Sequence, residues 1–362
     1  MLKMISHLII FIMFLIATSC KKEPPVVPPV AEQDTTSHSI NWVIDDIGDY
    51  GSILRDVTII NDSLAYAVGE IYRNDTLYNV AMWDGSKWNL KRIYYYGSCS
   101  AVKFPRLYAI WAFSDSNIVI TNGGSIGWFN GNTVTLDCAV NPLLTGAINK
   151  VWGKSSEDLF VVGNNGNITH YQNEQWNKIA SGTEVNLRDV WGSPDESAVW
   201  AAGFEDSYGT VFLRNTGNGF EKVLEITDPN LPHPPDQITH VFKSLWTDKA
   251  DTIYLGAIGR VYAAPKNTTG FAKENIWWDY ENETELPPET NIIRGTASND
   301  IFVGGYNQFV RHWNGASWKG YSEIEGDGTW RGMAVKDNLI IVVGESFSTP
   351  GSAIIARGYR IK

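Results

Sequence analysis

Short apolar segments alternate with polar, glycine-rich segments along most of this 362-residue chain. In the clearest copy of the pattern, Val151-Trp152-Gly153 is followed by an apolar run from Leu159 to Val162, then by Gly166-Asn167-Ile168-Thr169-His170-Tyr171 and by Trp176. Apolar runs of this length with Gly and Asn between them are typical of β-strands joined by tight turns. The pattern predicts four consecutive strands, and the run around Val161, apolar on both faces, predicts an inner strand sandwiched between neighbouring sheets.

Equivalent segments recur from one end of the chain to the other. Seven positions correspond to one another, at Thr58, Trp111, Trp152, Trp191, Trp246, Arg294 and Ala334. The spacings between them are 53, 41, 39, 55, 48 and 40 residues. A period of about 40 to 50 residues with four short strands per copy is typical of a β-propeller blade. We therefore expect an all-β protein, with a single seven-bladed β-propeller of four-stranded antiparallel blades over residues 40–362.

The turns and the outer strands of the repeat carry their own signals. Asp84-Gly85, Asn130-Gly131 and Asn314-Gly315 predict tight hairpin turns in which both central residues take positive φ. Trp88 and Trp318 follow two of these turns, and we expect them to begin outer strands and to pack on the neighbouring blade.

The two ends of the repeat region are complementary. The last copy lacks an outer strand, whereas Ile40-Asn41-Trp42-Val43-Ile44 is an unmatched strand at the beginning. We predict that this N-terminal strand completes the last blade, which would close the ring without an open edge.

Composition agrees with a folded β protein and excludes one class of partner. Apolar residues make up 43% of the chain, and its 15 Trp, 16 Tyr and 14 Phe favour strands. Acidic residues outnumber basic ones by 40 to 29, for a formal net charge of −11. Nucleic acid is therefore not expected as a partner, because neutralising phosphates needs a basic face.

The N-terminus has the pattern of an export signal. Lys3 precedes nine apolar residues, Leu8 to Ile16, which are too few to span a bilayer, since a spanning helix needs about 20. Small residues then lead into Cys20. This arrangement resembles a bacterial lipoprotein signal, although Ala17 stands where such signals more often have Leu. The resemblance implies a signal peptide over residues 1–19 and lipidation of Cys20, and the alternative is an ordinary secretory peptide.

The segment 20–39 has too few apolar side chains to form a core. It is rich in proline and polar residues, which predicts a disordered tether. The start Cys20-Lys21-Lys22-Glu23 resembles lipoproteins of Bacteroidetes-type bacteria, which implies a membrane anchor in the cell envelope, most simply in the outer membrane. The sequence leaves open whether the anchored protein faces the cell surface or the periplasm.

The repeat itself resembles a family of secreted bacterial propeller repeats related to kelch- and sialidase-like blades. The resemblance rests on Val-Trp-Gly, Val-Gly, Gly-x-Ile-x-His-Tyr and Gly-x-x-Trp, and it is strongest over residues 148–220. Members of this kind are mostly of unknown function and often lipoproteins. The resemblance therefore implies a fold more than an activity.

Two cysteines remain after Cys20. Cys99 and Cys138 would lie in an oxidising compartment, where they could form a disulfide or stay as two buried or free thiols. Metal binding by this pair is not expected without nearby histidines.

No strong catalytic motif is present. The sequence lacks His-Glu-x-x-His, a Walker loop and an EF-hand, so we predict no catalytic residue, metal site or cofactor. His170 and His312 occupy equivalent repeat positions and are interpreted as packing elements. Glu157-Asp158 and the matching Asp195-Glu196 and Asn299-Asp300 recur in the turn before the inner apolar strand and are interpreted as hairpin caps.

Aromatic residues in the segments between repeats are the candidate ligand-binding groups. One group is Trp277, Trp278 and Tyr280, and the other is Tyr94, Tyr95 and Tyr96. Each group could stack on a sugar or peptide, or could belong to an outer strand. Long connections follow Trp88, Phe220 and Tyr262, and two of them on one rim would form a binding site.

These observations favour an envelope-anchored, monomeric lipoprotein whose propeller is a non-catalytic binding or interaction module for an unknown protein or glycan. Two alternatives are a carbohydrate-active enzyme with carboxylates at the channel mouth, and a periplasmic scaffold for envelope protein assembly. The enzyme requires converging carboxylates, one of them with a raised pKa.

Overall fold

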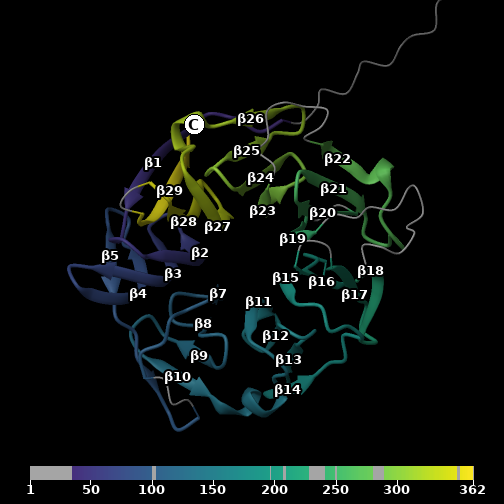
Figure 1. The fold of residues 1–362 in the computed structure, drawn as a ribbon, viewed down its shortest axis with the longest axis horizontal. Helices are drawn as coiled ribbons and strands as arrows, with labels where there is room; N and C mark the ends of the chain where they lie inside the picture. The colour runs from purple at the N-terminus through teal and green to yellow at the C-terminus, as the bar shows by residue number, and fades with distance from the viewer. Residues whose placement is uncertain are drawn as a thin grey trace, which may run out of the picture. The chain divides into compact units, whose positions relative to one another are not determined.

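The inner strands of seven β-sheets surround a central channel in this computed structural model (Figure 1). The structure describes residues 35–99, 103–195, 197–206, 209–227, 241–248, 251–279, 289–348 and 351–361. The predicted signal peptide, Cys20 and most of the predicted tether lie outside the described residues. We number the sheets as blades 1 to 7 in chain order and name the strand nearest the channel first.

The first three blades run from residue 53 to residue 178. Blade 1 contains β2 (Ile53–Asn61), β3 (Leu64–Arg73), β4 (Thr76–Trp83) and β5 (Trp88–Lys91). Blade 2 contains β7 (Ala109–Ala112), β8 (Ile118–Thr121), β9 (Ile126–Phe129), β10 (Val134–Asp137) and β6 (Tyr95–Tyr96). Blade 3 contains β11 (Ile148–Ser155), β12 (Asp158–Gly163), β13 (Ile168–Gln172) and β14 (Gln175–Lys178), and follows the 3-10 helix η1 (Cys138–Leu143).

The remaining blades complete the ring. Blade 4 contains β15 (Leu187–Gly192), β16 (Val199–Glu205), β17 (Gly209–Asn215) and β18 (Phe220–Ile226). Blade 5 contains β19 (Phe242–Thr247), β20 (Thr252–Ala257), β21 (Arg260–Pro265), η2 (Lys273–Asn275) and β22 (Ile276–Asp279). Blade 6 contains β23 (Thr290–Ala297), β24 (Asp300–Gly305), β25 (Val310–Trp313) and β26 (Trp318–Gly320), followed by η3 (Ser322–Ile324). Blade 7 contains β27 (Gly328–Lys336), β28 (Leu339–Ser346), β29 (Ala353–Arg360) and β1 (Ile40–Asp46).

The predicted fold class is confirmed, with two refinements. All seven equivalent positions lie in the innermost strands, so the strand around Val161, β12, is second from the channel rather than innermost. Blade 2 has a fifth strand, because β6 pairs in parallel with β10 through Tyr95 and Val134.

The N-terminal strand closes the ring as predicted. β1 pairs antiparallel with β29 over seven residues, from Ile40 opposite Arg360 to Asp46 opposite Ile354. The residues just before β1 also contact blade 6, where the Thr36 backbone N–H donates to the Asn314 carbonyl at 3.0 Å. The last blade therefore has no unpaired outer edge along its third strand.

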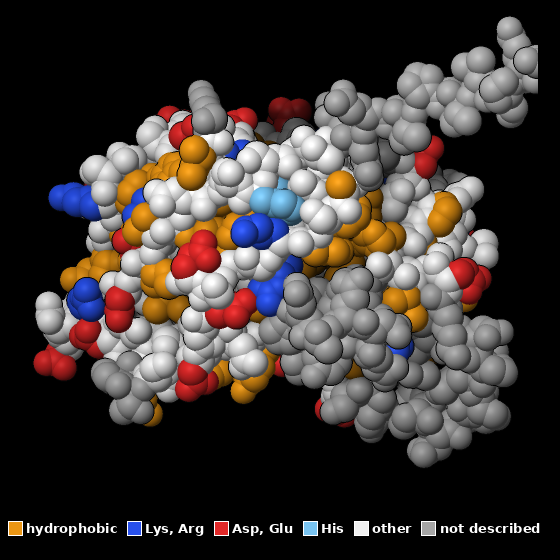
Figure 2. Space-filling view, turned by 90° about the horizontal axis from the view of Figure 1, so that it is seen from above, with side chains coloured by type: hydrophobic (Ala, Val, Ile, Leu, Met, Phe, Trp, Pro, Cys, Tyr) orange, Lys and Arg blue, Asp and Glu red, His pale blue; other side chains and the backbone are white. Residues whose placement is uncertain are grey.

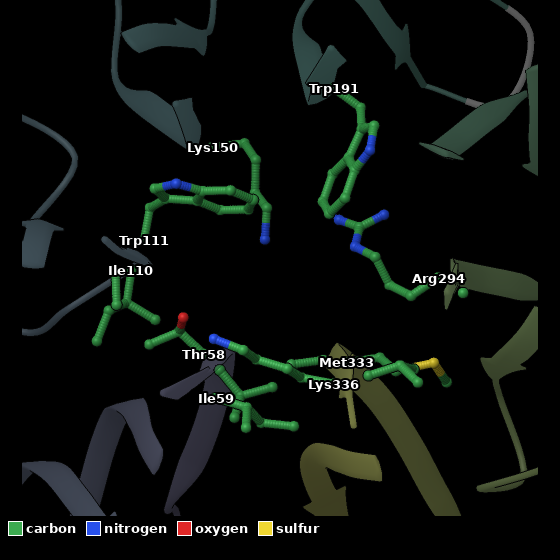
Figure 3. Close-up of a pocket in the computed structure, with 14 residues that line it drawn as sticks. Thr58, Ile59, Ile110, Trp111, Lys150, Trp191, Arg294, Met333 and Lys336 are labelled. Carbon is green, nitrogen blue, oxygen red and sulfur yellow. The ribbon is translucent and has the colours of Figure 1, made fainter. Parts of the chain in front are cut away.

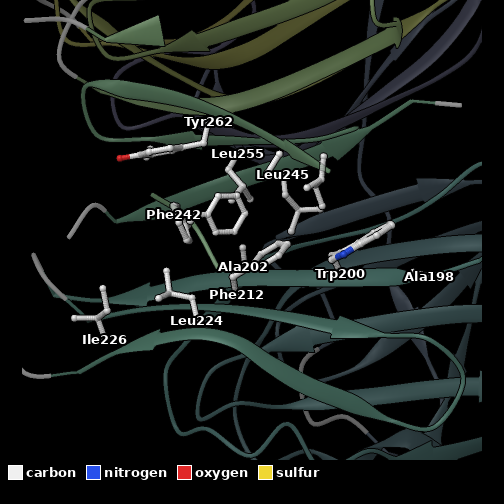
Figure 4. Close-up of a cluster of buried hydrophobic side chains, with 14 residues drawn as sticks. Ala198, Trp200, Ala202, Phe212, Leu224, Ile226, Phe242, Leu245, Leu255 and Tyr262 are labelled. Atoms are coloured by element: carbon white, nitrogen blue, oxygen red, sulfur yellow. The ribbon is translucent and has the colours of Figure 1, made fainter. Parts of the chain in front are cut away.

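The hydrophobic core is divided into layers between blades. Each of seven buried clusters joins side chains from two neighbouring blades. In the layer between blades 4 and 5, Phe212 packs against Phe242, with ring centroids 6.4 Å apart (Figure 4). The outer-strand tryptophans reach the preceding blade, since Trp88 donates to Asp45 of β1 at 3.1 Å and Trp318 packs on Trp277 of blade 5.

The predicted hairpin turns differ in one respect. Only the glycine takes positive φ, which is 90° at Gly85 and 99° at Gly315, and the preceding Asx residue does not. The Asp84 carboxylate instead accepts hydrogen bonds from the backbone N–H groups of Ser86 and Lys87, both at 2.9 Å. The Asx side chain thus stabilises the turn without entering the left-handed region itself.

Seen edge-on, the ring shows Lys and Arg side chains interspersed with Asp and Glu (Figure 2). Among the described residues, the helices are too short to cross a bilayer.

Candidate functional site

A ring of polar side chains surrounds one end of the channel. Six of the seven inner strands contain a β-bulge at the same place, three residues before the anchor position of the repeat. The bulged residues are Arg55, Asn149, Arg188, Lys243, Asn291 and Arg331, and Tyr108 occupies the equivalent position in blade 2. All seven line a cavity of about 100 Å³ at this end. We call these seven residues the basic mouth. Since a bulge leaves one residue outside the ladder and redirects its side chain, the shared irregularity explains why they converge.

The recurring glycine of the repeat makes room for the bulge. Gly163 pairs with Ile148 just before the bulge, and a Cβ atom on it would lie 2.0 Å from the Ala147 carbonyl oxygen. Gly203 and Gly344 have the same relationship, at 2.1 and 2.0 Å from a backbone oxygen of their inner strand. The Val-Gly element in the sequence is therefore the partner of the bulge, because only glycine permits so close a backbone approach.

Three of the four cations in the basic mouth are held by carboxylates at its edge. Arg55 contacts Glu70 at 3.1 Å, and Lys243 contacts Glu289 at 2.7 Å. Arg331 donates through Nε to Glu345 at 2.9 Å. The carboxylates fix these side chains and reduce their net charge.

Arg188 is different. Among the described residues no carboxylate lies within ion-pairing distance of its guanidinium, and its buried Nε atom has no hydrogen-bond partner. The guanidinium lies over the ring of Phe204, 5.0 Å from the centroid. Burial lowers the pKa of Arg188, and the negative charge of Glu205 partly opposes this shift. A half-buried guanidinium whose buried Nε atom has no hydrogen-bond partner favours an anionic ligand beside it.

A polar groove leads outward from the basic mouth. It has a volume of about 820 Å³, and Tyr108, Asn149 and Arg188 line both the groove and the mouth. Its other walls come from blades 2 and 3 and carry the amides Asn122, Asn141 and Asn164 and the glycines Gly123, Gly124 and Gly146. We call it the asparagine groove. Carboxamides and accessible backbone can both donate and accept hydrogen bonds, as an extended peptide requires.

Two buried ion pairs lie deeper in the channel. Lys150 Nζ contacts Asp56 Oδ1 at 2.6 Å, and Arg294 binds both oxygens of Asp189 at 3.0 and 3.1 Å. Burial raises the pKa of Asp189, but the charges of Arg294 and Lys150 and the hydrogen bonds from Arg294 and Ser244 outweigh it and hold the pKa below its usual value.

The two aspartates also join neighbouring blades through the backbone. Asp56 accepts from the N–H of Ile110 in blade 2, and Asp189 accepts from the N–H of Leu245 in blade 5, both at 3.0 Å. Both carboxylates in the channel are thus neutralised and fully engaged. Asp189 lacks the raised pKa that an enzyme acting through a protonated channel carboxyl group requires.

The aromatic candidates do not come together. Tyr95 is buried and burial raises its pKa, whereas its neighbours Tyr94 and Tyr96 are 37% and 64% exposed. This alternation is that of an outer strand. Trp277 lies in β22 on another blade and is packed against Trp313 and Trp318 of blade 6, at 5.2 and 5.0 Å between centroids. The side chain of Trp278 and the whole of Tyr280 lie outside the described residues.

The long connections lead to the same end of the channel. Those after Trp88, Phe220 and Tyr262 precede β7, β19 and β23, and the residues at the start of these strands, Tyr108, Lys243 and Asn291, belong to the basic mouth. Large parts of the second and third connections, residues 228–240 and 280–288, lie outside the described residues.

Histidine and cysteine residues have structural positions. His170 stacks on Phe160 at 3.9 Å and bonds to Asp158, and His312 stacks on Phe302 at 4.3 Å and bonds to Asp300. Asp158 and Asp300 are therefore partners of the histidines rather than turn caps. Each aspartate lies on the strand next to its histidine, two residues before the phenylalanine that pairs with that histidine. The structure joins Cys99 and Cys138 in a disulfide. Among the described residues no group of His, Cys, Asp and Glu could hold a metal ion.

The fold and its axial cavities define the chain as a seven-bladed β-propeller. No protein-family model and no curated protein matches its sequence. Solved structures match its fold. YCF48 bound to a D1 peptide has a TM-score of 0.64 at 12% identity, covering 93% of this chain and 100% of that one. YCF48 from Cyanidioschyzon merolae has a TM-score of 0.60 at 10% identity, covering 88% and 98%.

A third solved structure also matches the fold. The WD40 β-propeller domain of Doa1 has a TM-score of 0.59 at 14% identity, covering 88% of this chain and 96% of that one. At these identities the likeness concerns the fold, which is commonly a binding or scaffold module.

Proposed function

We propose that this protein is an interaction module that binds an extended, carboxylate-bearing peptide segment at the basic mouth and along the asparagine groove. The observation that carries the proposal is the convergence of four cations at bulged positions, one of which, Arg188, has no carboxylate in contact among the described residues. The positive charge of Arg188 is thus not paired with a contacting carboxylate of the described residues, although the chain as a whole has a net charge of −11. Local charge of this kind attracts and orients an acidic partner.

The groove supports a peptide rather than a compact ligand. Its volume of about 820 Å³ and its continuity with the mouth suit a segment that enters from the rim and places a carboxylate near Arg188. The related fold of YCF48 has been solved with a peptide bound. A glycan remains the alternative ligand, and an enzyme receives no support from the two neutralised channel aspartates.

Fluorescence polarisation tests the proposal directly. The probe is a labelled peptide of alternating Glu and Gly, compared with the same peptide carrying Gln. We expect the Glu peptide to bind more tightly, with an affinity that falls as salt is added. Arg188→Met should weaken binding about tenfold, which corresponds to one charge-assisted hydrogen bond. Lys87→Met, on an exposed turn of blade 1, is the matched control. Equal affinity for the two peptides, or an unchanged affinity of Arg188→Met, would reject the proposal.

We also propose that a lipid on Cys20 anchors the module in the cell envelope, with the outer membrane as the expected location. The support is the sequence of residues 1–23. Cys20→Ala should release the protein in soluble form, and continued membrane association of that variant would overturn the anchor. Protease treatment of intact cells then distinguishes the two faces. Loss of the propeller places it at the surface, whereas protection places it in the periplasm, where a role in envelope protein assembly becomes testable by crosslinking.

A further inference from the structure

A second cavity occupies the channel beyond the ion pairs, on the side away from the basic mouth. It has a volume of about 270 Å³ and is lined by side chains that come later in the inner strands, including Thr58, Trp111, Trp191 and Lys336 (Figure 3). We call it the tryptophan cavity. Lys150, Arg294 and Met333 also line the cavity at the basic mouth, so they form the partition between the two.

Most of the residues that line the tryptophan cavity are apolar. Trp111 and Trp191 meet edge to face with centroids 5.4 Å apart, and both are partly exposed. Aliphatic side chains from blades 1, 2 and 7 complete the lining. A volume slightly below the range of about 300 to 1,000 Å³ that accommodates drug-sized molecules indicates a small ligand. Indole walls favour a flat apolar body.

The charge of the cavity points to an anion. Three cations reach it (Figure 3). The amino group of Lys150 is directed into the cavity, the amino group of Lys336 ends beside Thr58, and the guanidinium of Arg294 lies over the ring of Trp191, 4.7 Å from its centroid. Asp56 neutralises Lys150, and Asp189 neutralises Arg294. Lys336 is exposed, and among the described residues it has no hydrogen-bond or ion-pair partner. One positive charge is therefore uncompensated.

The polar side chains distinguish between kinds of anion. The hydroxyl group of Thr58 is the one strong hydrogen-bond acceptor among the described side chains that line the cavity. The other polar groups are the cations and the two indole N–H groups, which only donate. A sugar acid would bring several hydroxyl groups that each donate a hydrogen bond, and burying them without acceptors costs free energy. A planar organic anion has no such groups.

We propose that the tryptophan cavity binds a small planar organic anion, with its carboxylate on the ammonium group of Lys336 and its ring against Trp111 and Trp191. The site lies on the opposite side of the ion pairs from the proposed peptide site and is independent of it. Its ligand class is an aromatic or similarly flat monocarboxylate.

Benzoate is the probe, and calorimetry together with the tryptophan fluorescence of the intact protein gives the readout. We expect saturable binding of benzoate, and binding of the neutral, equally flat benzamide about tenfold weaker or more. Lys336→Met should weaken benzoate binding by a similar factor, whereas Lys336→Arg should retain most of it. Both variants change an exposed side chain, so they should fold, and Lys87→Met is again the matched control.

Three results with the unsubstituted protein would overturn the proposal. They are an absence of saturable benzoate binding, equal affinities for benzoate and benzamide, and glucuronate binding as tightly as benzoate. Unchanged benzoate binding by Lys336→Met would remove the role assigned to Lys336 and overturn the proposal as stated. The peptide assay is unaffected by these outcomes, so the two proposals fail separately.

Discussion

Asp189 and Arg294 bind each other across the channel although they are 105 residues apart in the chain and belong to blades 4 and 6. The contact is bidentate and buried, and Asp189 also accepts a hydrogen bond from the Ser244 hydroxyl of the intervening blade at 2.6 Å. Three blades are thus connected through one carboxylate. Such a contact gives the inner strands a defined spacing around the axis.

Removing one partner of this pair should be costly. Arg294→Met leaves Asp189 charged and buried without its counter-ion, and we expect a loss of about 3–5 kcal/mol in the free energy of unfolding. Urea denaturation at about pH 7 measures the loss. The variant is compared with Arg214→Met, in which the ion pair lost is with the largely exposed Glu221. Equal effects of the two substitutions would contradict the role assigned to the buried pair.

The Asp189–Arg294 pair should make the stability of the protein depend on pH in the acid range. The pKa of Asp189 in the folded protein lies below its ordinary value of 3.8, so the folded state binds fewer protons than the unfolded state in this region. The stabilisation is therefore fully present well above that value and is lost as the pH falls below it. Arg294→Met should lack this part of the acid transition, which parallel denaturation series would show.

The glycine partners of the bulges should resist substitution. Gly163→Ala would place a Cβ atom 2.0 Å from the Ala147 carbonyl oxygen, and the strand must shift to accommodate it. We expect a loss of about 3 kcal/mol or more, with weakened peptide binding as the neighbouring Asn149 is displaced. Gly270→Ala, where no atom lies within 4 Å, is the matched control and should change stability by less than about 1 kcal/mol. A mild effect at Gly163 would mean that the bulge does not depend on glycine.

A pair of histidines should make the start of the propeller sensitive to mild acid. His38 and His312 face each other with their Nδ1 atoms 3.0 Å apart, and His312 is fully buried on Asp300. Burial lowers the pKa of both histidines. At His38, the charges of His312 and Lys319 lower the pKa further. At His312, the charge of Arg360 also lowers the pKa, whereas the hydrogen bond and charge of Asp300 raise it.

Because both pKa values lie below 6.5 in the folded state, the unfolded chain takes up protons first as the pH falls. The melting temperature should decrease as the pH falls through about 6, and hydrogen exchange of residues 36–40 should accelerate before the rest of the ring. His38→Gln should flatten the decrease. An equally steep pH dependence in that variant would refute the role of the pair.

The closing strand should contribute measurably to the whole ring. Deleting residues 40–44 removes most of β1 and exposes the edge of β29. It also removes the backbone that positions Asp45, whose carboxylate binds Arg357 at 2.6 Å. We expect a decrease of roughly 5 °C or more in the melting temperature. Asp45→Asn, which keeps the strand, should have the smaller effect. An unchanged melting temperature after the deletion would show that the ring does not depend on β1.

Much of the fold could be predicted from the sequence because its signals are local. Strand length, the Asx-Gly turns and the outer-strand Trp88 and Trp318 are each visible within a few residues, and their repetition defines the blades. Even the closure by residues 40–44 follows from counting strands in the first and last copies.

The basic mouth was not found in this way, although a signal was present. Arg55, Arg188, Lys243 and Arg331 all stand three residues before an anchor position. Each alone resembles an ordinary polar residue at the start of a strand. Their convergence depends on bulges and on seven strands that share an axis, and neither is visible within one repeat.

The aromatic candidates illustrate the opposite difficulty. Trp277 packs between blades 5 and 6, and Tyr95 is buried under the edge of blade 2. A ring that stacks on a ligand and a ring that stacks on the next blade have the same sequence pattern, because both need a flat apolar surface. The sequence therefore predicts that these rings stack, but it does not distinguish stacking on a ligand from stacking on a neighbouring blade.

The pairing of β1 with β29 has a consequence for how the protein is made. Ile40 and Arg360 become neighbours only after the whole propeller has been synthesised, since they lie in its first and last strands. The native structure thus depends on a contact of very long sequence separation, which slows folding. Until β29 has emerged, β1 has no strand to pair with, and the ring stays open although its other blades are built from consecutive strands.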